Sequence, residues 1–312
     1  MNVSRAGPGL LTAVVVALSA GLGGCDRRGG GAPPVEEGTG PGAAWELVYD
    51  LKVGDNTDLF AISAEEATPR RLTEAPGYDG MARYTPDGET IVFSSKRTGH
   101  WQLFEIPAEG GKARQIRTNR ATEYQADPSG DGKTLAFLTN LDGPERLVLL
   151  DLATSDLREL VRHGRKTIFG NPSWSPDGRR ITFSSNWRIG HQIYVVDVAS
   201  AETRRVSPIA SGGCEPRFTR DGRRVCYVSR GHLRQTSRLV AHDLETGEEE
   251  VLVDWPAMNY DPAFSPDGTE MAFASDVSGA FAIYRQRLSD GRAWRVTHGP
   301  GEARYPDYRP KR

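Results

Sequence analysis

Residues 173–185 read SWSPDGRRITFSS, and this stretch decides the fold because the chain repeats it. Related stretches begin at Arg83 (RYTPDGETIVFSS), Arg217 (RFTRDGRRVCYVS) and Ala263 (AFSPDGTEMAFAS), and a degenerate one begins at Asp127 (DPSGDGKTLAFLT). Their last turn glycines are spaced by 44, 46, 44 and 46 residues, at Gly88, Gly132, Gly178, Gly222 and Gly268. A fixed period of about 40–45 residues is typical of the four-stranded blades of a β-propeller.

Each copy predicts a β-hairpin, because Pro favours the first corner of a type I turn and Gly accepts the left-handed backbone that closes it. The third residue after each turn glycine is aliphatic or Met, namely Ile91, Leu135, Ile181, Val225 and Met271. The fifth is aromatic, namely Phe93, Phe137, Phe183, Tyr227 and Phe273, and a smaller residue lies between them. Apolar residues on both faces indicate a strand that is covered on two sides, as in a blade packed between two other blades.

The two ends of the repeat region predict how the ring closes. The first unit, with strands expected at 45–51, 56–63 and 69–73, lacks an innermost strand of its own. The C-terminal stretch EARYPDYRPKR aligns with the opening of the last full copy, so that Pro310 lies 44 residues after Pro266. We therefore expect an all-β, six-bladed β-propeller in which the C-terminal strand completes the first blade, an arrangement that protects strand edges.

The N-terminal residues predict export and lipid attachment. Residues 1–24 contain one charge, Arg5, and the short apolar run LLTAVVVALSAGL, which suits a signal peptide better than a membrane-spanning helix. The sequence Leu-Gly-Gly-Cys that ends at Cys25 resembles the lipobox of bacterial lipoproteins, so Cys25 is the expected lipidation site. Residues 25–43 are rich in Gly and Pro and predict a flexible tether, and residues 44–312 form the propeller. The expected location is the cell envelope, facing the periplasm, on a membrane leaflet that the sequence does not identify.

The repeats resemble those of the TolB-like propeller family, which carry a W-S-P-D-G hairpin, an I-Y strand and a terminal L-T. The matching residues are Trp174-Ser175-Pro176-Asp177-Gly178, Ile193-Tyr194, Ile283-Tyr284 and Leu72-Thr73. This resemblance covers residues 44–312 and implies the fold more strongly than the function. TolB, which gives the family its name, has an α/β domain in front of the propeller and binds the peptidoglycan-associated lipoprotein. The resemblance makes that lipoprotein a possible partner, although a tether and a lipid replace the α/β domain here.

Several classes of function lack support in the sequence. The formal charge of −2 offers no basic surface for nucleic acid. The six histidines show no paired metal-ligand spacing, no Gly-x-Ser-x-Gly elbow is present, and no motif indicates a cofactor. A three-residue hairpin loop would place Cys226 opposite Pro216 and only diagonal to Cys214, which is too far for a disulfide.

The expected functional surface is the mouth of the central channel, where the innermost strands of six blades begin. The candidate residues there are Asp79, Met81, Glu123, Gln125, Asn171, Glu215, Asn259, Asp261, Arg304 and Tyr305. These side chains are mostly acidic or amide, so a peptide or a basic group suits them better than a phosphate. The sequence predicts a monomeric, non-catalytic lipoprotein whose propeller binds or scaffolds a periplasmic protein or peptide. The alternative is a carbohydrate-active lyase or hydrolase with an acid/base pair drawn from Glu123, Glu215 and Asp261.

Overall fold

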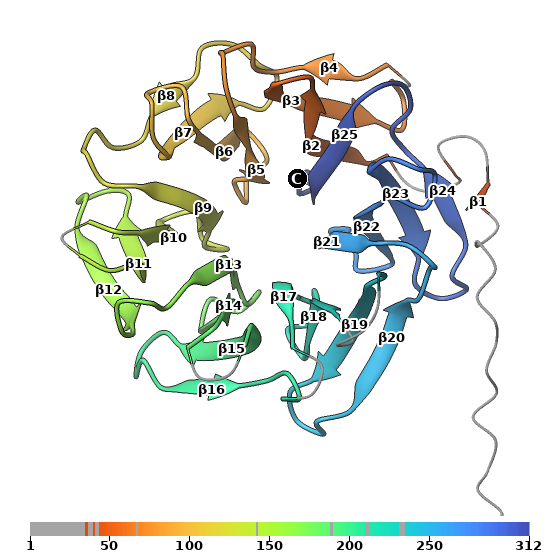
Figure 1. Cartoon of the computed structure of the whole chain (residues 1–312). Helices are drawn as coiled ribbons and strands as arrows, with labels where there is room; N and C mark the ends of the chain where they lie inside the picture. Colours follow the sequence, from red (N-terminus) through yellow and green to blue (C-terminus); the bar gives the residue numbers. More distant parts are fainter. Residues whose placement is uncertain are drawn as a thin grey trace, which may run out of the picture.

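A computed structural model describes residues 35–36, 40, 44–66, 68–141, 143–187, 190–209, 212–230 and 235–311. Six β-sheets form a ring around a central channel (Figure 1). The described residues include no helix that is long and apolar enough to cross a membrane. Cys25 and the predicted signal peptide lie outside the described residues.

The blades follow the chain around the ring, each with four strands ordered from the channel outward. Blade 1 consists of β25 (Glu302–Tyr308), β2 (Glu46–Val53), β3 (Asn56–Ser63) and β4 (Arg70–Arg71). Blade 2 consists of β5 (Asp79–Tyr84), β6 (Thr90–Ser95), β7 (Gln102–Pro107) and β8 (Arg114–Gln115). Blade 3 consists of β9 (Glu123–Pro128), β10 (Thr134–Thr139), β11 (Arg146–Asp151) and β12 (Leu157–Arg162).

The second half of the ring repeats this order. Blade 4 consists of β13 (Phe169–Trp174), β14 (Arg180–Ser185), β15 (Gln192–Asp197) and β16 (Thr203–Arg205). Blade 5 consists of β17 (Cys214–Phe218), β18 (Arg224–Ser229), β19 (Arg238–Asp243) and β20 (Glu249–Val253). Blade 6 consists of β21 (Asn259–Phe264), β22 (Glu270–Ser275), β23 (Ala282–Arg287) and β24 (Ala293–Arg295).

The predicted closure of the ring is confirmed. Strand β25, near the C-terminus, pairs antiparallel with β2 so that Leu47 lies opposite Tyr308. Figure 1 shows this pairing, with the blue β25 beside the orange β2 at the centre of the ring. The aliphatic and aromatic positions that the repeats predict in the second strand of each blade are at most 1% exposed. The core is therefore formed largely between neighbouring blades, as the two-sided apolar pattern indicates.

The hairpin loops are one residue longer than the three-residue loop that the sequence suggested for blade 5. The N–H of Thr219 donates to the carbonyl of Arg224 at 3.0 Å, so residues 220–223 form the loop. Gly222 has the left-handed φ of 66° that the turn requires. Cys226 consequently lies opposite Arg217, not opposite Pro216, and Cys214 and Cys226 are both free thiols.

One segment of the predicted tether packs against the propeller. Strand β1 (Val35–Glu36) pairs in parallel with β24 and adds a fifth strand to blade 6. The indole N–H of Trp294 donates to the carboxylate of Glu36 at 3.1 Å. Gly40 has a φ of 75°, and a Cβ there would come within 2.5 Å of the Trp294 ring. No pattern in residues 26–43 indicates this contact, because Val35 is the one large apolar residue there.

Candidate functional site

Each innermost strand contains one residue with a left-handed backbone, at the third position of the strand or its equivalent. Their φ values lie between 49° and 55°, at Met81, Gln125, Asn171, Glu215, Asp261 and Tyr305. The register of each innermost strand against the second strand shifts near this residue, which is the mark of a β-bulge. A left-handed conformation costs a non-glycine residue about 1–2 kcal/mol, so other contacts must hold all six bulges.

Hydrogen bonds between blades hold most of these bulges. The N–H of Asn171 donates to Oε1 of Gln125 at 2.9 Å, and the N–H of Asp261 donates to Oε2 of Glu215 at 2.8 Å. The N–H of Tyr305 donates to Oδ2 of Asp261 at 3.2 Å. These acceptors were predicted as ligand-binding residues. They also connect blade 3 to blade 4, blade 5 to blade 6, and blade 6 to blade 1.

Three carboxylates gather where blades 5, 6 and 1 meet the channel. Asp261 is 5% exposed and Asp50 is 2% exposed. Arg304 is the cation beside them: its Nε donates to Oδ2 of Asp261 at 2.5 Å, and its Nη2 lies 3.6 Å from Oε1 of Glu215. Oδ1 of Asp261 is buried and has no hydrogen-bonding partner among the described residues. We call Asp50, Glu215, Asp261 and Arg304 the acidic cluster.

Burial changes the ionisation of the acidic cluster. Burial raises the pKa of Asp50 to about 8, against hydrogen bonds from the Met81 N–H and the Tyr78 hydroxyl that lower it. Burial, and next the charge of Asp261, raise the pKa of Glu215 well above its ordinary value. Asp261 and Glu215 therefore share the guanidinium of Arg304, and the charge of Asp261 opposes ionisation of both Glu215 and Asp50. An additional cation or N–H donor in the channel would stabilise the ionised forms of these carboxyls.

The raised pKa of Asp50 predicts a pH-dependent stability. The ordinary pKa of this carboxyl is 3.8, so between pH 4 and 8 the folded protein holds a proton that the unfolded chain releases. The free energy of unfolding should therefore fall as pH rises through this window, by up to about 1.4 kcal/mol per pH unit for one proton. Asp50→Asn should reduce the slope of this dependence in urea unfolding measured from pH 5 to 8, whereas Asp55→Asn, in an exposed turn, should leave it unchanged. An equal slope in Asp50→Asn and the wild type would contradict this assignment.

The structure places two predicted candidates away from this cluster. Asp79 accepts a hydrogen bond from the Ser95 hydroxyl at 2.6 Å and pairs with Arg97 at 2.6 Å, inside blade 2. Glu123 is fully buried and pairs with Arg117 at 3.2 Å. Both residues open their strands, two positions before the bulge. Asp79 holds the loop between β6 and β7, and Glu123 holds the connection from β8 to β9. The structure does bring together four of the candidates, namely Glu215, Asp261, Arg304 and Tyr305. Farther around the ring, Gln125 of blade 3 accepts the N–H of Asn171 of blade 4.

Asp50 was missed because it lies on a second strand, β2, and not on an innermost one. A signal was available in the repeat. The equivalent residues of the other second strands are small or apolar, namely Ser94, Leu138, Ser184, Val228 and Ala274. A carboxylate at a position that the repeat keeps small or apolar indicates a specific role, because burying a charge without a partner is costly.

A second layer of polar residues lies farther along the channel, two positions after each bulge. One residue from each blade lines a cavity of about 170 Å³ there, namely Arg83, Asp127, Ser173, Arg217, Ala263 and Asp307. Residues of the hairpin loops, such as Pro86 and Pro176, also line this cavity, which places it at the hairpin end of the channel. We call it the axial cavity. The residues predicted from the sequence lie at the strand openings, so the axial cavity was missed.

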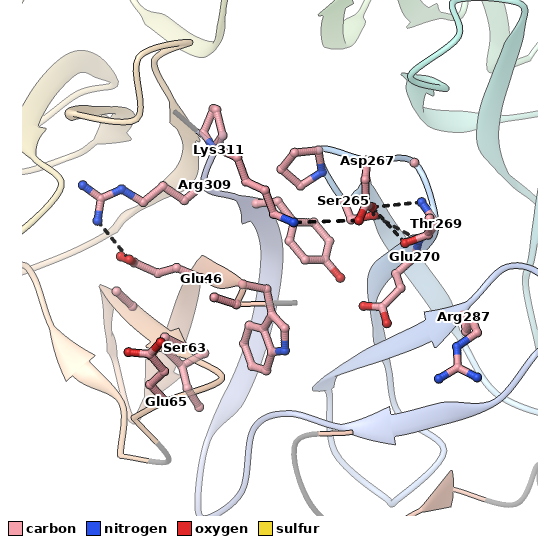
Figure 2. Close-up of a pocket in the computed structure, with 18 of the residues that line it drawn as sticks. Glu46, Ser63, Glu65, Ser265, Asp267, Thr269, Glu270, Arg287, Arg309 and Lys311 are labelled. Carbon is pink, nitrogen blue, oxygen red and sulfur yellow. Dashed lines mark hydrogen bonds and ion pairs between the residues drawn. The ribbon is translucent and has the colours of Figure 1, made fainter. Parts of the chain in front are cut away.

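A groove of about 1060 Å³ lies between blades 1 and 6 (Figure 2). It arises because β25 and β2 come from opposite ends of the propeller, so no hairpin fills this side of blade 1. Two ion pairs form along this groove. Arg309 contacts Glu46 at 2.9 Å, and Lys311 lies 3.9 Å from Asp267. In Figure 2 the Lys311 side chain reaches across toward Asp267.

The described residues include no group of three or more His, Cys, Asp or Glu side chains that could hold a metal ion.

Comparisons with known proteins point to one family. The model of the TolB β-propeller domain matches residues 41–166 and 214–312. A TolB homologue of Chlorobium chlorochromatii is 25% identical over 142 residues, which are 46% of this chain and 31% of that protein. The chain spans less than half the length of the curated relatives that it matches.

Solved structures share the fold at low sequence identity. TolB from Acinetobacter baumannii superimposes with a TM-score of 0.75 at 20% identity, over 86% of this chain and 67% of that one. An oligogalacturonate lyase from Vibrio parahaemolyticus gives a TM-score of 0.55 at 16% identity, over 80% of this chain and 73% of that one. At these identities the likeness concerns the fold alone.

Proposed function

This chain belongs to the TolB β-propeller domain family, and on that premise we propose that its acidic cluster binds a protein or peptide of the bacterial cell envelope. One observation carries the proposal: Oδ1 of Asp261 is buried at the channel without a hydrogen-bonding partner among the described residues. A buried acceptor left without a donor costs free energy. A bound ammonium, guanidinium or peptide N–H would satisfy it.

The charges and aromatic rings around the cluster suit such a guest. The guanidinium of Arg304 stacks against Tyr260, Phe281 and Tyr305 at 4.8, 4.7 and 5.2 Å, which fixes its position between the carboxylates. Glu215 and Asp50 would ionise more readily beside a second cation. A basic side chain or an N-terminal amine of a partner therefore fits the cluster better than an anion does.

Attachment to a membrane through Cys25 would present this channel to the periplasm. Only residues 26–34 would then separate the lipid from β1, which limits the separation to about 30 Å for a fully extended chain. Partners that are themselves held at the envelope lie within such a reach. By resemblance, the peptidoglycan-associated lipoprotein is the first partner to test, with the chain acting as a monomer and without catalysis.

Crosslinking in cells, followed by affinity purification and mass spectrometry, tests the proposal. A Glu215→Gln/Asp261→Asn double variant keeps the oxygens that accept the Asp261 and Tyr305 N–H bonds while it removes both negative charges. We expect one envelope protein to be enriched with the wild type and reduced at least tenfold with this variant. A Glu202→Gln/Glu248→Gln variant, changed at exposed acids on the outer parts of blades 4 and 5, should retain that partner. Equal recovery with all three proteins would refute a role for the acidic cluster.

A carbohydrate-active enzyme is the second candidate, because Glu215 has a raised pKa and lies beside Asp261, as an acid/base pair requires. Three aromatic rings also follow one another: Tyr78 meets Trp101 edge to face at 5.0 Å, and Trp101 stacks on Tyr124 at 6.1 Å. The hydroxyl of Tyr78 donates to Asp50 of the acidic cluster at 2.8 Å, so the series begins at the channel. Products released from acidic oligosaccharides by the wild type, and not by Glu215→Gln, would favour this candidate over binding alone.

A further inference from the structure

We propose that the axial cavity is a binding site for a small carboxylate, held by the guanidinium of Arg217. This site is separate from the acidic cluster and carries the opposite charge. It does not depend on the function proposed above.

The guanidinium of Arg217 is only partly used by the protein. Its Nη1 donates to Oδ1 of Asp127 at 3.0 Å and to the hydroxyl of Ser173 at 3.3 Å. Its Nη2 is buried and has no hydrogen-bonding partner among the described residues. The side chain is 13% exposed and lines the cavity, so an acceptor for Nη2 would lie in or beside the cavity.

The charged residues that line the axial cavity have a net charge that one negative charge would neutralise. Three guanidiniums, of Arg83, Arg217 and Arg220, face two carboxylates, of Asp127 and Asp307. Arg220 donates to the carbonyls of Phe264 and Ser265, and its charge acts on Asp127 and Asp307 through space. Burial raises the pKa of Asp127 to about 7, which reduces the average negative charge of the lining near neutral pH. A monoanion balances this arrangement, whereas two nearby carboxylates would oppose a dianion.

The carboxylates of the cavity are fixed by backbone donors and are poor acceptors for Nη2. Oδ2 of Asp127 accepts the N–H of Trp174 at 2.8 Å, and Oδ2 of Asp307 accepts the N–H of Tyr84 at 2.9 Å. The aromatic residues of the lining, among them Phe218 and Phe264, lower the local polarity and strengthen a charge-assisted bond.

The volume limits the guest to a small group. A water molecule takes about 30 Å³ of the liquid, so a cavity of about 170 Å³ holds a carboxylate with a few atoms attached. Two sources supply such a group: a free short-chain acid, or the C-terminal carboxylate of a peptide that enters at the hairpin end. Their shared chemistry is a planar, singly charged oxyanion that accepts from Arg217 Nη2.

Ligand titrations of the full chain at constant ionic strength test this site. Sodium acetate, acetyl-alanyl-alanine, its C-terminal amide, phosphate and chloride are titrated while the melting temperature and binding heat are followed. We expect saturable binding of a carboxylate with a rise in melting temperature, and no binding of the amide. Acetate binding alone would identify a free acid as the guest, and preference for the dipeptide acid would identify a chain terminus. Tighter binding of phosphate than of either carboxylate would overturn the chosen ligand class.

Two arginine variants make the test specific. Arg217→Gln should weaken carboxylate binding at least tenfold, and Arg217→Lys, which keeps the charge, serves if Arg217→Gln does not fold. Arg224→Gln is the matched control, because Arg224 pairs with Glu250 at 2.5 Å outside the axial cavity. A crystal soaked in bromoacetate should show bromine in the axial cavity of the wild type and not of the Arg217 variant. No saturable binding, or equal binding by wild type and Arg217→Gln, would overturn the proposal.

Discussion

Deletion of residues 303–312 should abolish cooperative unfolding of the propeller, the largest effect that we expect. These residues form most of β25, the innermost strand of blade 1, and its loss leaves the edge of β2 unpaired. Two contacts to neighbouring blades would also disappear: Oδ2 of Asp307 accepts the N–H of Tyr84 in blade 2, and Arg304 pairs with Asp261 in blade 6. Tyr308, which is 2% exposed, would leave a gap in the core between blades 6 and 1.

Urea unfolding followed by both circular dichroism and tryptophan fluorescence measures this effect. The two signals should coincide for the wild type and separate, or lose their sigmoidal form, after the deletion. Deletion of residues 311–312 is the control. It removes an exposed pair in which Lys311 lies 3.9 Å from Asp267, and such pairs contribute little. Coincident transitions at the wild-type midpoint after the longer deletion would show that β25 does not close the ring.

Glu270→Leu should lower the free energy of unfolding by about 3–5 kcal/mol, the usual cost of removing one partner of a buried ion pair. Arg285 is 1% exposed and donates to Glu270 through Nε at 3.1 Å and through Nη2. The same guanidinium lies 4.2 Å from the ring centre of Trp45. The pair therefore joins blade 6 to Trp45, the residue directly before β2 of blade 1, at the groove where the ring closes.

A double variant separates the cost of an isolated charge from the cost of lost packing. Arg285→Met/Glu270→Leu removes both charges and keeps apolar volume against Trp45, so it should recover most of the stability that Glu270→Leu loses. The midpoint and slope of urea unfolding, compared for the wild type and the two variants, give these differences. A double variant as unstable as Glu270→Leu would show that packing, and not the loss of the carboxylate partner of Arg285, is the cause.

The repeat predicted the fold well because its signal is local and is present five times. A turn with Asp-Gly, followed by alternating aliphatic and aromatic residues, specifies a hairpin within one blade. The apolar residues on both faces of its second strand pack against the two neighbouring blades. The same alignment predicted the C-terminal strand, since Pro306 and Pro310 keep the spacing of Pro262 and Pro266. The one error in the hairpin, a loop taken as three residues instead of four, shifted the partner of Cys226 from Arg217 to Pro216.

The candidate site was predicted less completely because it depends on contacts between blades. Period-two alternation gives no sign of a bulge, so Asp79 and Asp261 were predicted alike as residues of the channel mouth. Asp79 bonds within its own blade, whereas Asp261 contacts Arg304 at the channel. Asp50 and Arg217 are far apart in sequence from the residues they meet.

By itself, the sequence determined the all-β class, the number of blades and the strand that closes the ring. These properties follow from short-range patterns that each blade must satisfy to be buried on both faces. The tertiary structure alone decided which charges meet. It brings Asp50, Glu215, Asp261 and Arg304 together at one level of the channel, and Arg83, Asp127 and Arg217 at another. The physical reason is the ring, because it places the innermost strand of every blade beside a common axis. The bulge in each strand then determines how far along that axis each side chain lies.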